Sequence, residues 1–203
     1  VGKRPVALAT AQALNCLSPV EPGPDEVDAC GRCAACERIM RGVHPDVLVV
    51  EPDDKGSIKT DVVRDVIART AFRPFEGRRR VVIINDADAL EQQAQNALLK
   101  TLEEPPASSV FLLVTARPDM LLQTVRSRCP RLSFRPLGAA ELAAALASRG
   151  VPAAEARAVA ATADGSLGRA LEAQGGDMVE VREAAHLVLS HVARAGSPAQ
   201  KVK

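Results

Sequence analysis

The 203-residue sequence contains no tryptophan or tyrosine and only four phenylalanines. Aromatic side chains are the usual platforms on which single-stranded nucleic acids stack their bases, so their scarcity argues against a stacking groove. The formal net charge is only +1, without the strong positive balance that is typical of a nucleic-acid-binding domain. Any contact with DNA must therefore come from a local basic patch or from partner chains.

Long apolar runs are also missing, because no stretch approaches the ~18 to 20 uninterrupted apolar residues of a membrane-spanning helix. The first residues, VGKR, have neither the apolar segment nor the cleavage pattern of a secretory signal. We therefore expect a soluble, cytoplasmic protein. Hydrophobic residues still make up 47% of the chain, enough for an aliphatic core of Val, Leu, Ile and Ala in one α/β domain with a small helical companion.

Short β-branched runs alternate with segments of helical periodicity. Strands are predicted at residues 46–52, 81–84, 110–115 and 131–134. Helices are predicted at residues 5–17, 59–72, 90–104 and 119–128. This alternation predicts a parallel sheet with helices on both faces. After residue 136 alanine dominates and the periodicity is entirely helical, so a domain boundary is predicted there.

Four of the five cysteines lie in the first 36 residues, with the spacing C-x13-C-x2-C-x2-C at Cys16, Cys30, Cys33 and Cys36. In a reducing compartment this clustering favours a metal over disulfides. Four thiolates can close a tetrahedral zinc site, and a site filled entirely by protein ligands is structural, not catalytic. The alternatives are incidental buried thiols or a redox pair.

Two further patterns are typical of nucleotide chemistry. In VVIINDADAL (81–90), Asp86 follows a buried strand, where an acid can reach the Mg²⁺ of a nucleotide; alternatively, Asp86 and Asp88 cap the next helix. Gly2-Lys3-Arg4 is similar to the end of a phosphate-binding loop, G-x4-G-K-[ST], with Arg in place of the hydroxyl that binds Mg²⁺.

The basic run at 78–80 has two interpretations, a contact with DNA phosphates or a solvated flank at the start of a strand. The three histidines show no spacing that indicates catalysis.

The run NALLKTLEEPP (96–106), the strand VFLLVT after it and Ser127-Arg128-Cys129 together resemble the clamp-loader branch of AAA+ proteins. The resemblance covers essentially the whole chain. It is closest to the gamma/tau and delta-prime types of bacterial DNA polymerase III, which also carry a four-cysteine zinc module.

That resemblance implies a domain organisation. We expect a RecA-like AAA+ domain at residues 1–136 with the zinc module inserted at 16–36 and its first strand missing from the chain. A helical lid at 137–176 follows, and 177–203 would begin a truncated helical collar domain. The chain would then be a fragment or a mis-started chain.

The resemblance also separates hydrolysing from non-hydrolysing subunits. In the gamma/tau type the strand-end Asp is followed by a Glu that polarises water, whereas here Asp86 is followed by Ala87. Together with Arg4, this predicts a delta-prime-type subunit without intrinsic ATP turnover, and whether ATP binds at all stays open. By resemblance, Arg128 is an arginine finger for the ATP of a neighbouring subunit; its alternative is a surface Arg near a helix C-terminus.

Two more positions match by resemblance, Thr115 with sensor 1 and Arg169 with sensor 2, although each also fits an ordinary surface role. The expected partners are gamma/tau and delta subunits, with the sliding clamp and primed DNA as clients of the assembly. The competing hypotheses are an active gamma/tau-type ATPase and a zinc-dependent nucleic-acid-binding module.

Overall fold

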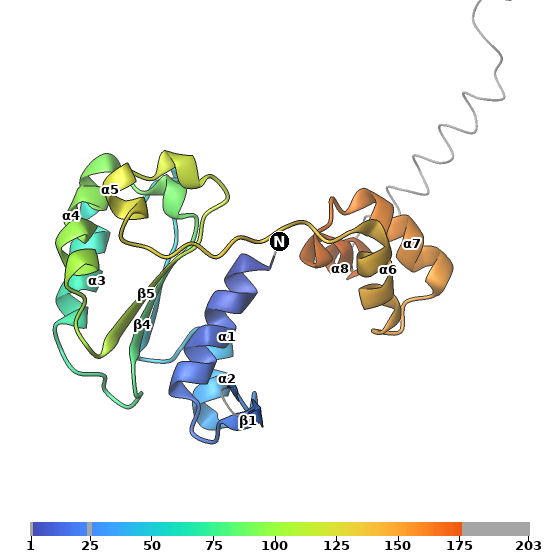
Figure 1. Ribbon diagram of the computed structural model, residues 1–203, viewed down its shortest axis with the longest axis horizontal. Coiled ribbons are helices and arrows are strands. Elements are labelled where there is room, and N and C mark those ends of the chain that lie inside the picture. The colour runs from blue at the N-terminus through green and yellow to red at the C-terminus, as the bar shows by residue number, and fades with distance from the viewer. Residues whose placement is uncertain (1, 24–25, 176–203) are drawn as a thin grey trace, which may run out of the picture. The chain divides into compact units, whose positions relative to one another are not determined.

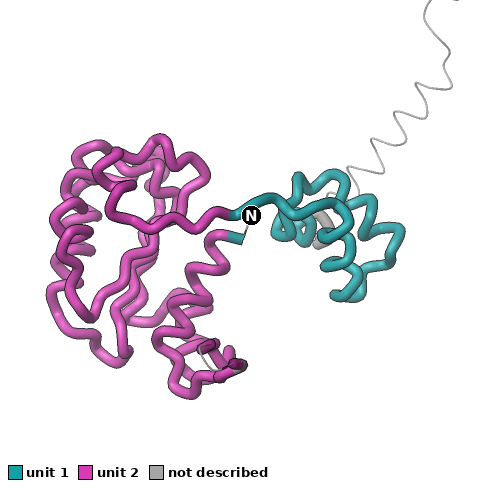
Figure 2. Tube along the Cα trace, viewed as in Figure 1, with its two compact units in different colours: residues 1–2, 134–203 teal, residues 3–133 magenta. Residues whose placement is uncertain are grey.

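The computed structural model describes residues 2–23 and 26–175. The chain forms two compact units, shown separately in Figure 2. The larger unit holds residues 3–133, and the described part of the smaller unit holds Gly2 and residues 134–175. Each unit is considered by itself below.

The larger unit is organised around a parallel sheet of three strands, β3 (Val47–Val50), β4 (Arg80–Ile84) and β5 (Ser109–Leu113). Their order is β3-β4-β5, with Val47 opposite Val81 and Val81 opposite Val110. Every residue of the central strand β4 is buried, which explains why its sequence is an apolar run without alternation. These three strands were predicted from the sequence.

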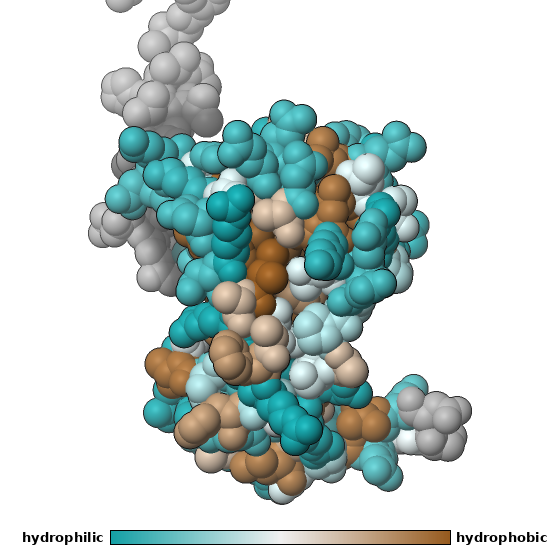
Figure 3. Space-filling model, turned by 90° about the vertical axis from the view of Figure 1, so that its left-hand side faces the viewer, coloured by the Kyte–Doolittle hydropathy of each residue, from teal (hydrophilic) through white to brown (hydrophobic). Residues whose placement is uncertain are grey.

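Helices cover both faces of this sheet, as predicted (Figure 1). On one face, α3 (Thr60–Thr70) and α4 (Gln92–Glu103) pack through Val63 and Leu98. On the other, α1 (Lys3–Asn15) and α2 (Ala34–Met40) pack through Ala11 and Ile39. Viewed from the side of α3 and α4, the surface is mostly hydrophilic with interspersed apolar side chains (Figure 3).

The predicted helix at 59–72 corresponds to α3. Its residues Val63, Val66 and Thr70 are buried at helical spacing, whereas Val62 is 42% exposed. The predicted helix at 119–128 is a 3-10 turn, η2 (Pro118–Met120), followed by the short helix α5 (Gln123–Arg126). A second 3-10 turn, η1 (Ala87–Ala89), links β4 to α4.

The predicted fourth strand at 131–134 is wrong, because the structure assigns no strand there and Leu132 is 71% exposed. Pro130 and Pro136 flank the segment, and a proline has no N–H to donate to a ladder. Conversely, an antiparallel hairpin of β1 (Val20–Gly23) and β2 (Glu26–Asp28) was missed. The residues of β2 are all exposed, so this strand carries no alternating apolar signal.

The smaller unit contains α6 (Ala139–Ala147), α7 (Ala153–Thr162) and α8 (Leu167–Gly175). Leu142 and Leu146 centre its core, packed against small alanine side chains of α7 and α8. A β-carbon on Gly165, which has φ +71°, would lie 2.7 Å from the carbonyl oxygen of Leu137, so glycine is required at this turn. The predicted collar segment, 177–203, lies outside the described residues.

Among the helices of the described residues, none combines the length and apolar character needed to cross a membrane.

Candidate metal centre and nucleotide site

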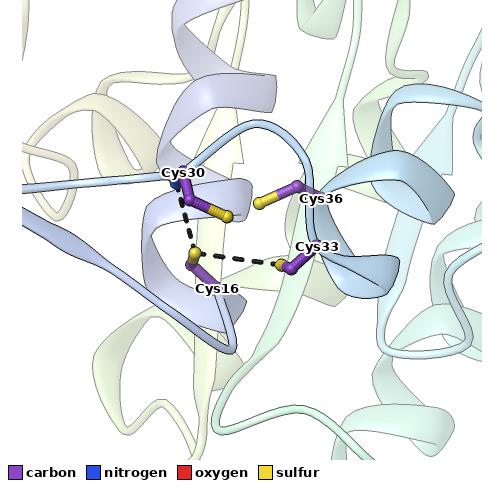
Figure 4. A group of neighbouring side chains, drawn as sticks. All are labelled: Cys16, Cys30, Cys33 and Cys36. Atoms are coloured by element: carbon purple, nitrogen blue, oxygen red, sulfur yellow. Dashed lines mark hydrogen bonds between the residues drawn. The ribbon is translucent and has the colours of Figure 1, made fainter.

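The four predicted cysteines converge at one end of the larger unit (Figure 4). Cys16 directly follows α1, and Cys30 follows β2. Cys33 precedes α2, and Cys36 lies in its first turn. The hairpin therefore folds the chain back so that the distant Cys16 joins the three closely spaced cysteines. The four sulfur atoms lie within 4.8 Å of one another.

This arrangement fits the chemistry of zinc. Zn–S bonds of ~2.3 Å in a tetrahedron place the sulfur atoms ~3.8 Å apart. The Sγ atoms of Cys16 and Cys33 are 3.9 Å apart. The four cysteines could therefore hold a zinc ion with little movement. When bound, the ion would cross-link the end of α1 to the start of α2, and the four protein ligands would fill its coordination sphere.

The acidities of these thiols are unequal. Burial opposes the charged form of Cys33, but hydrogen bonds from the backbone of Cys36 and Leu17 outweigh it and lower its pKa to about 6. Burial and the neighbouring Cys33 raise the pKa of Cys36 to about 12. One thiolate is thus available at neutral pH, whereas a second stays protonated until a cation offsets its charge, so metal binding releases protons.

The basic run at 78–80 ties this cysteine cluster to the sheet. The guanidinium of Arg78 donates to the carbonyl oxygen of Cys16, and the backbone N–H of Arg79 donates to Asn15 Oδ1 at 3.0 Å. The guanidinium of Arg79 donates to the carbonyl oxygen of Ala107. Arg80 is 8% exposed. Of the three arginines only Arg80 is buried, whereas Arg78 and Arg79 connect these segments from exposed positions.

Arg80 forms the buried centre of that connection with Asp46. The Asp46 carboxylate accepts hydrogen bonds from the backbone N–H groups of Phe75, Glu76 and Gly77 at 2.7 to 2.9 Å and from Arg80 Nη2 at 2.9 Å. Burial alone would raise the pKa of Asp46, but these four donors lower it to about 2. Sequence reasoning missed this residue, because its partners lie some thirty residues away.

His44 belongs to the same network. Its Nδ1 accepts a hydrogen bond from the backbone N–H of Asp46 at 3.2 Å, and its Nε2 lies 3.4 Å from Glu76 Oε1. Burial lowers the pKa of His44 despite the nearby carboxylates. The residue is therefore a structural histidine of the larger unit.

The end of the phosphate-loop pattern lies at the start of α1. Gly2 adopts φ +81°, and the helix begins at Lys3. Arg4 turns its guanidinium to the carboxylate of Glu51, with Nη2 at 2.8 Å from Oε1. Glu51 directly follows β3. The Arg4 side chain thus contacts the carboxyl edge of the sheet.

Two consecutive residues at the end of β4, Asn85 and Asp86, differ in burial and in their contacts. Asn85 is the first residue after the strand and is only 6% exposed. Its Nδ2 donates to Glu51 Oε1 at 3.1 Å, and its buried Oδ1 has no partner among the described residues. Asp86 is exposed, with φ 46° and ψ 51°. The Asp86 side chain makes no capping hydrogen bond, which removes the capping interpretation for this residue. Asn85 and Glu51 were both missed, although their places directly after strands could have indicated them.

Thr115, predicted at the sensor 1 position, forms a hydrogen bond with Asp88 and not with Asp86. Thr115 Oγ1 donates to Asp88 Oδ1 at 2.7 Å and accepts from the backbone N–H of Arg117 at 2.9 Å. Arg117 Nε donates to the second Asp88 oxygen at 2.8 Å. Burial opposes the charge of Asp88, but these donors outweigh it and lower the pKa. No hydrogen bond in the described residues joins Thr115 to Asp86.

The two remaining predicted arginines differ in setting. Arg128, just beyond α5, donates from Nη1 to the carbonyl oxygen of Thr124 at 2.8 Å and from Nη2 to Glu103 at the end of α4. Its side chain is 32% exposed. Arg169 lies on α8 in the smaller unit and pairs with Asp164 at 3.1 Å, with 67% of its side chain exposed.

The fold and this geometry can now be compared with known proteins. Residues 1–138 match the family model described as "DNA polymerase III, delta subunit". The chain belongs to this family. The matched range includes the four cysteines, the start of α1, the end of β4 and Arg128, whereas Arg169 lies beyond it.

Individual relatives agree with this membership. The chain is 41% identical over 130 residues to DNA polymerase III subunit delta' of Pseudomonas aeruginosa, covering 64% of the chain and 38% of that relative. It is 38% identical over 163 residues to subunit delta' of Escherichia coli, covering 79% and 48%. It is also 36% identical over 137 residues to subunit tau of Salmonella typhimurium, covering 68% and 20%. The chain thus spans less than half the length of each of these relatives.

Proposed function

We propose that this chain is the nucleotide-fold part of a non-hydrolysing subunit of the bacterial sliding-clamp loader, and that it supplies Arg128 to ATP bound on a neighbouring subunit. The observation that carries the proposal is the difference between the contacts of Arg4 and those of Arg128. Arg4 occupies the position of the metal-binding hydroxyl and is paired with Glu51. Arg128 is held by the carbonyl oxygen of Thr124 and by Glu103, and its side chain is partly exposed.

The chemistry of Arg128 suits this role. A guanidinium is planar and permanently charged, so it can stabilise the charge that develops on a γ-phosphate as it leaves. Two of its nitrogen atoms are anchored, by the Thr124 carbonyl and the Glu103 carboxylate. A group with five N–H donors keeps others for a phosphate. Arginine fingers contribute ~10³ to 10⁵ in rate in other phosphoryl-transfer systems.

The proposal extends to the remaining assignments. Residues 1–136 would form the RecA-like AAA+ domain and 137–176 the lid, with 177–203 opening the collar through which the subunits assemble. The partners would be gamma/tau and delta subunits, acting on the sliding clamp and primed DNA in the cytoplasm. A zinc ion on the four cysteines would have a structural role and would take no part in catalysis. Asp86, Thr115 and Arg169 would be remnants of a nucleotide site.

The experiment is ATP turnover by the reconstituted clamp loader containing the full-length subunit with Arg128→Ala. We expect assembly to persist while turnover at the neighbouring site falls by ~10³ or more. Arg126→Ala is the matched control, because Arg126 ends α5 two residues before Arg128 and, among the described residues, pairs with exposed Asp119. Equal turnover by wild type and the Arg128 variant would remove the finger role.

The second candidate is an active gamma/tau-type ATPase, which the 36% identity to a tau subunit favours. Brisk hydrolysis by the isolated full-length protein, abolished when Lys3 is replaced by Ala, would support this candidate over the first. The zinc-dependent nucleic-acid module has less support, because the formal net charge is only +1 and the sequence has no tryptophan or tyrosine on which bases could stack.

A further inference from the structure

Three side chains meet at the carboxyl edge of the sheet in the larger unit. Arg4 reaches it from the first turn of α1, Glu51 follows β3, and Asn85 follows β4. A single oxygen, Glu51 Oε1, lies 2.8 Å from Arg4 Nη2 and 3.1 Å from Asn85 Nδ2. This oxygen therefore links the first turn of α1 to the end of the central strand.

In a phosphate-loop nucleotide site, Mg²⁺ is held between the hydroxyl that follows the loop lysine and an acid at the end of a strand. Here the residue after Lys3 is Arg4, and the buried residue at the end of β4 is Asn85. A hydroxyl is thus replaced by a fixed positive charge, and the buried residue next to Glu51 is a neutral amide, while the acid Asp86 is exposed one residue later. Mg²⁺ requires a near-octahedral shell of oxygen ligands, and neither Arg4 nor Asn85 supplies a charged oxygen to it.

The buried Asn85 side chain gives independent evidence that this edge is built to receive a cationic donor. Its Oδ1 is buried and accepts no hydrogen bond within the described residues. Buried carbonyl oxygens are nearly always satisfied. The edge therefore presents a carboxylate in contact with the Arg4 guanidinium and, on Asn85, a buried carbonyl oxygen without a partner among the described residues.

We propose that Arg4 is a resident cation that takes the place of Mg²⁺ in this nucleotide fold, and that Glu51, positioned by the Asn85 amide, holds it there. The inference rests on the proposed non-hydrolysing function and explains at the atomic level why no metal-assisted hydrolysis occurs on this chain. A phosphate that reached the site would meet a guanidinium, which binds phosphate oxygens in a bidentate manner without a metal. We therefore expect that divalent cations do not bind at this edge of the sheet.

The test is a titration of the full-length protein with Mn²⁺ in the presence of ADP, followed by electron paramagnetic resonance. Mn²⁺ prefers oxygen ligands, so it distinguishes this edge from the four cysteines. We expect no saturable Mn²⁺ site in the wild type. The double variant Arg4→Ser with Asn85→Asp introduces a hydroxyl and an acid. It should bind one equivalent of Mn²⁺ in a saturable manner, at least about tenfold more tightly than any residual binding by the wild type.

The matched control is Arg41→Ser, which removes an exposed arginine paired with Glu37 on α2, away from this edge. It should leave Mn²⁺ binding as in the wild type. Thermal melts followed by circular dichroism identify any variant that does not fold, and Arg4→Ser alone then serves as the milder replacement.

Two results would overturn the proposal. One is a saturable Mn²⁺ site in the wild type that Glu51→Gln abolishes, because Glu51 would then be a metal ligand. The other is a folded double variant that binds Mn²⁺ no better than the wild type. Neither result bears on the finger role, which stands or falls with the Arg128→Ala turnover.

Discussion

Replacing Asp46 by Asn should destabilise the larger unit in a pH-dependent way. The Asp46 side chain is inaccessible to solvent, and its carboxylate accepts from three backbone N–H groups and from Arg80. An amide can accept on one atom only and brings no charge. Asn would therefore leave the buried Arg80 guanidinium without a counter-charge and at least one backbone donor without an acceptor.

The magnitude follows from the pKa. Asp46 titrates at about 2 in the folded chain, against an ordinary value of 3.8. Because each pKa unit corresponds to ~1.4 kcal/mol, the charged form contributes about 2 kcal/mol of stability. A lowered pKa means that this contribution is complete above pH ~4 and is lost as the pH falls toward 2. Breaking a buried pair costs ~3 to 5 kcal/mol, which sets the upper limit.

The assay is urea unfolding of wild type and Asp46→Asn at pH 7 and pH 3. The free energies of unfolding should differ by ~2 to 4 kcal/mol at pH 7, and the difference should narrow by about 1 kcal/mol at pH 3. Loss of a bound metal in acid affects both proteins and cancels in the comparison. A difference that is the same at both pH values, or smaller than ~0.5 kcal/mol at pH 7, would refute the reasoning.

Two further predictions concern the metal and the core. The purified protein should contain one equivalent of zinc, and a chelator or Cys33→Ser should lower the melting temperature without changing the turnover of an assembled loader; an equally stable, metal-free protein would exclude a structural zinc. Leu98→Ala removes a fully buried side chain of α4 and should cost ~2 to 5 kcal/mol in urea unfolding. Val62→Ala, at a position 42% exposed, is its control and should cost well under half as much.

Much of the fold was open to prediction because its signals are local. A buried parallel strand is an uninterrupted apolar run, and an amphipathic helix repeats its apolar positions every three or four residues. These rules predicted β3, β4, β5 and the helices between them. They failed at 131–134, where four residues between prolines have the composition of a strand but no neighbouring strand to pair with. They also missed the hairpin of β1 and β2. The residues of β2 are all exposed, so they show no alternation of apolar and polar residues.

The sequence by itself determined the cysteine cluster and the family, because both depend on residue types at fixed spacing. Only the tertiary structure decided which neighbours act together. It buried Arg80 against Asp46, placed Asn85 instead of Asp86 beside Glu51, and joined Thr115 to Asp88. These contacts join residues 27 to 34 positions apart. No local pattern encodes such pairings, because they arise where separate strands and helices end at the same edge of a sheet.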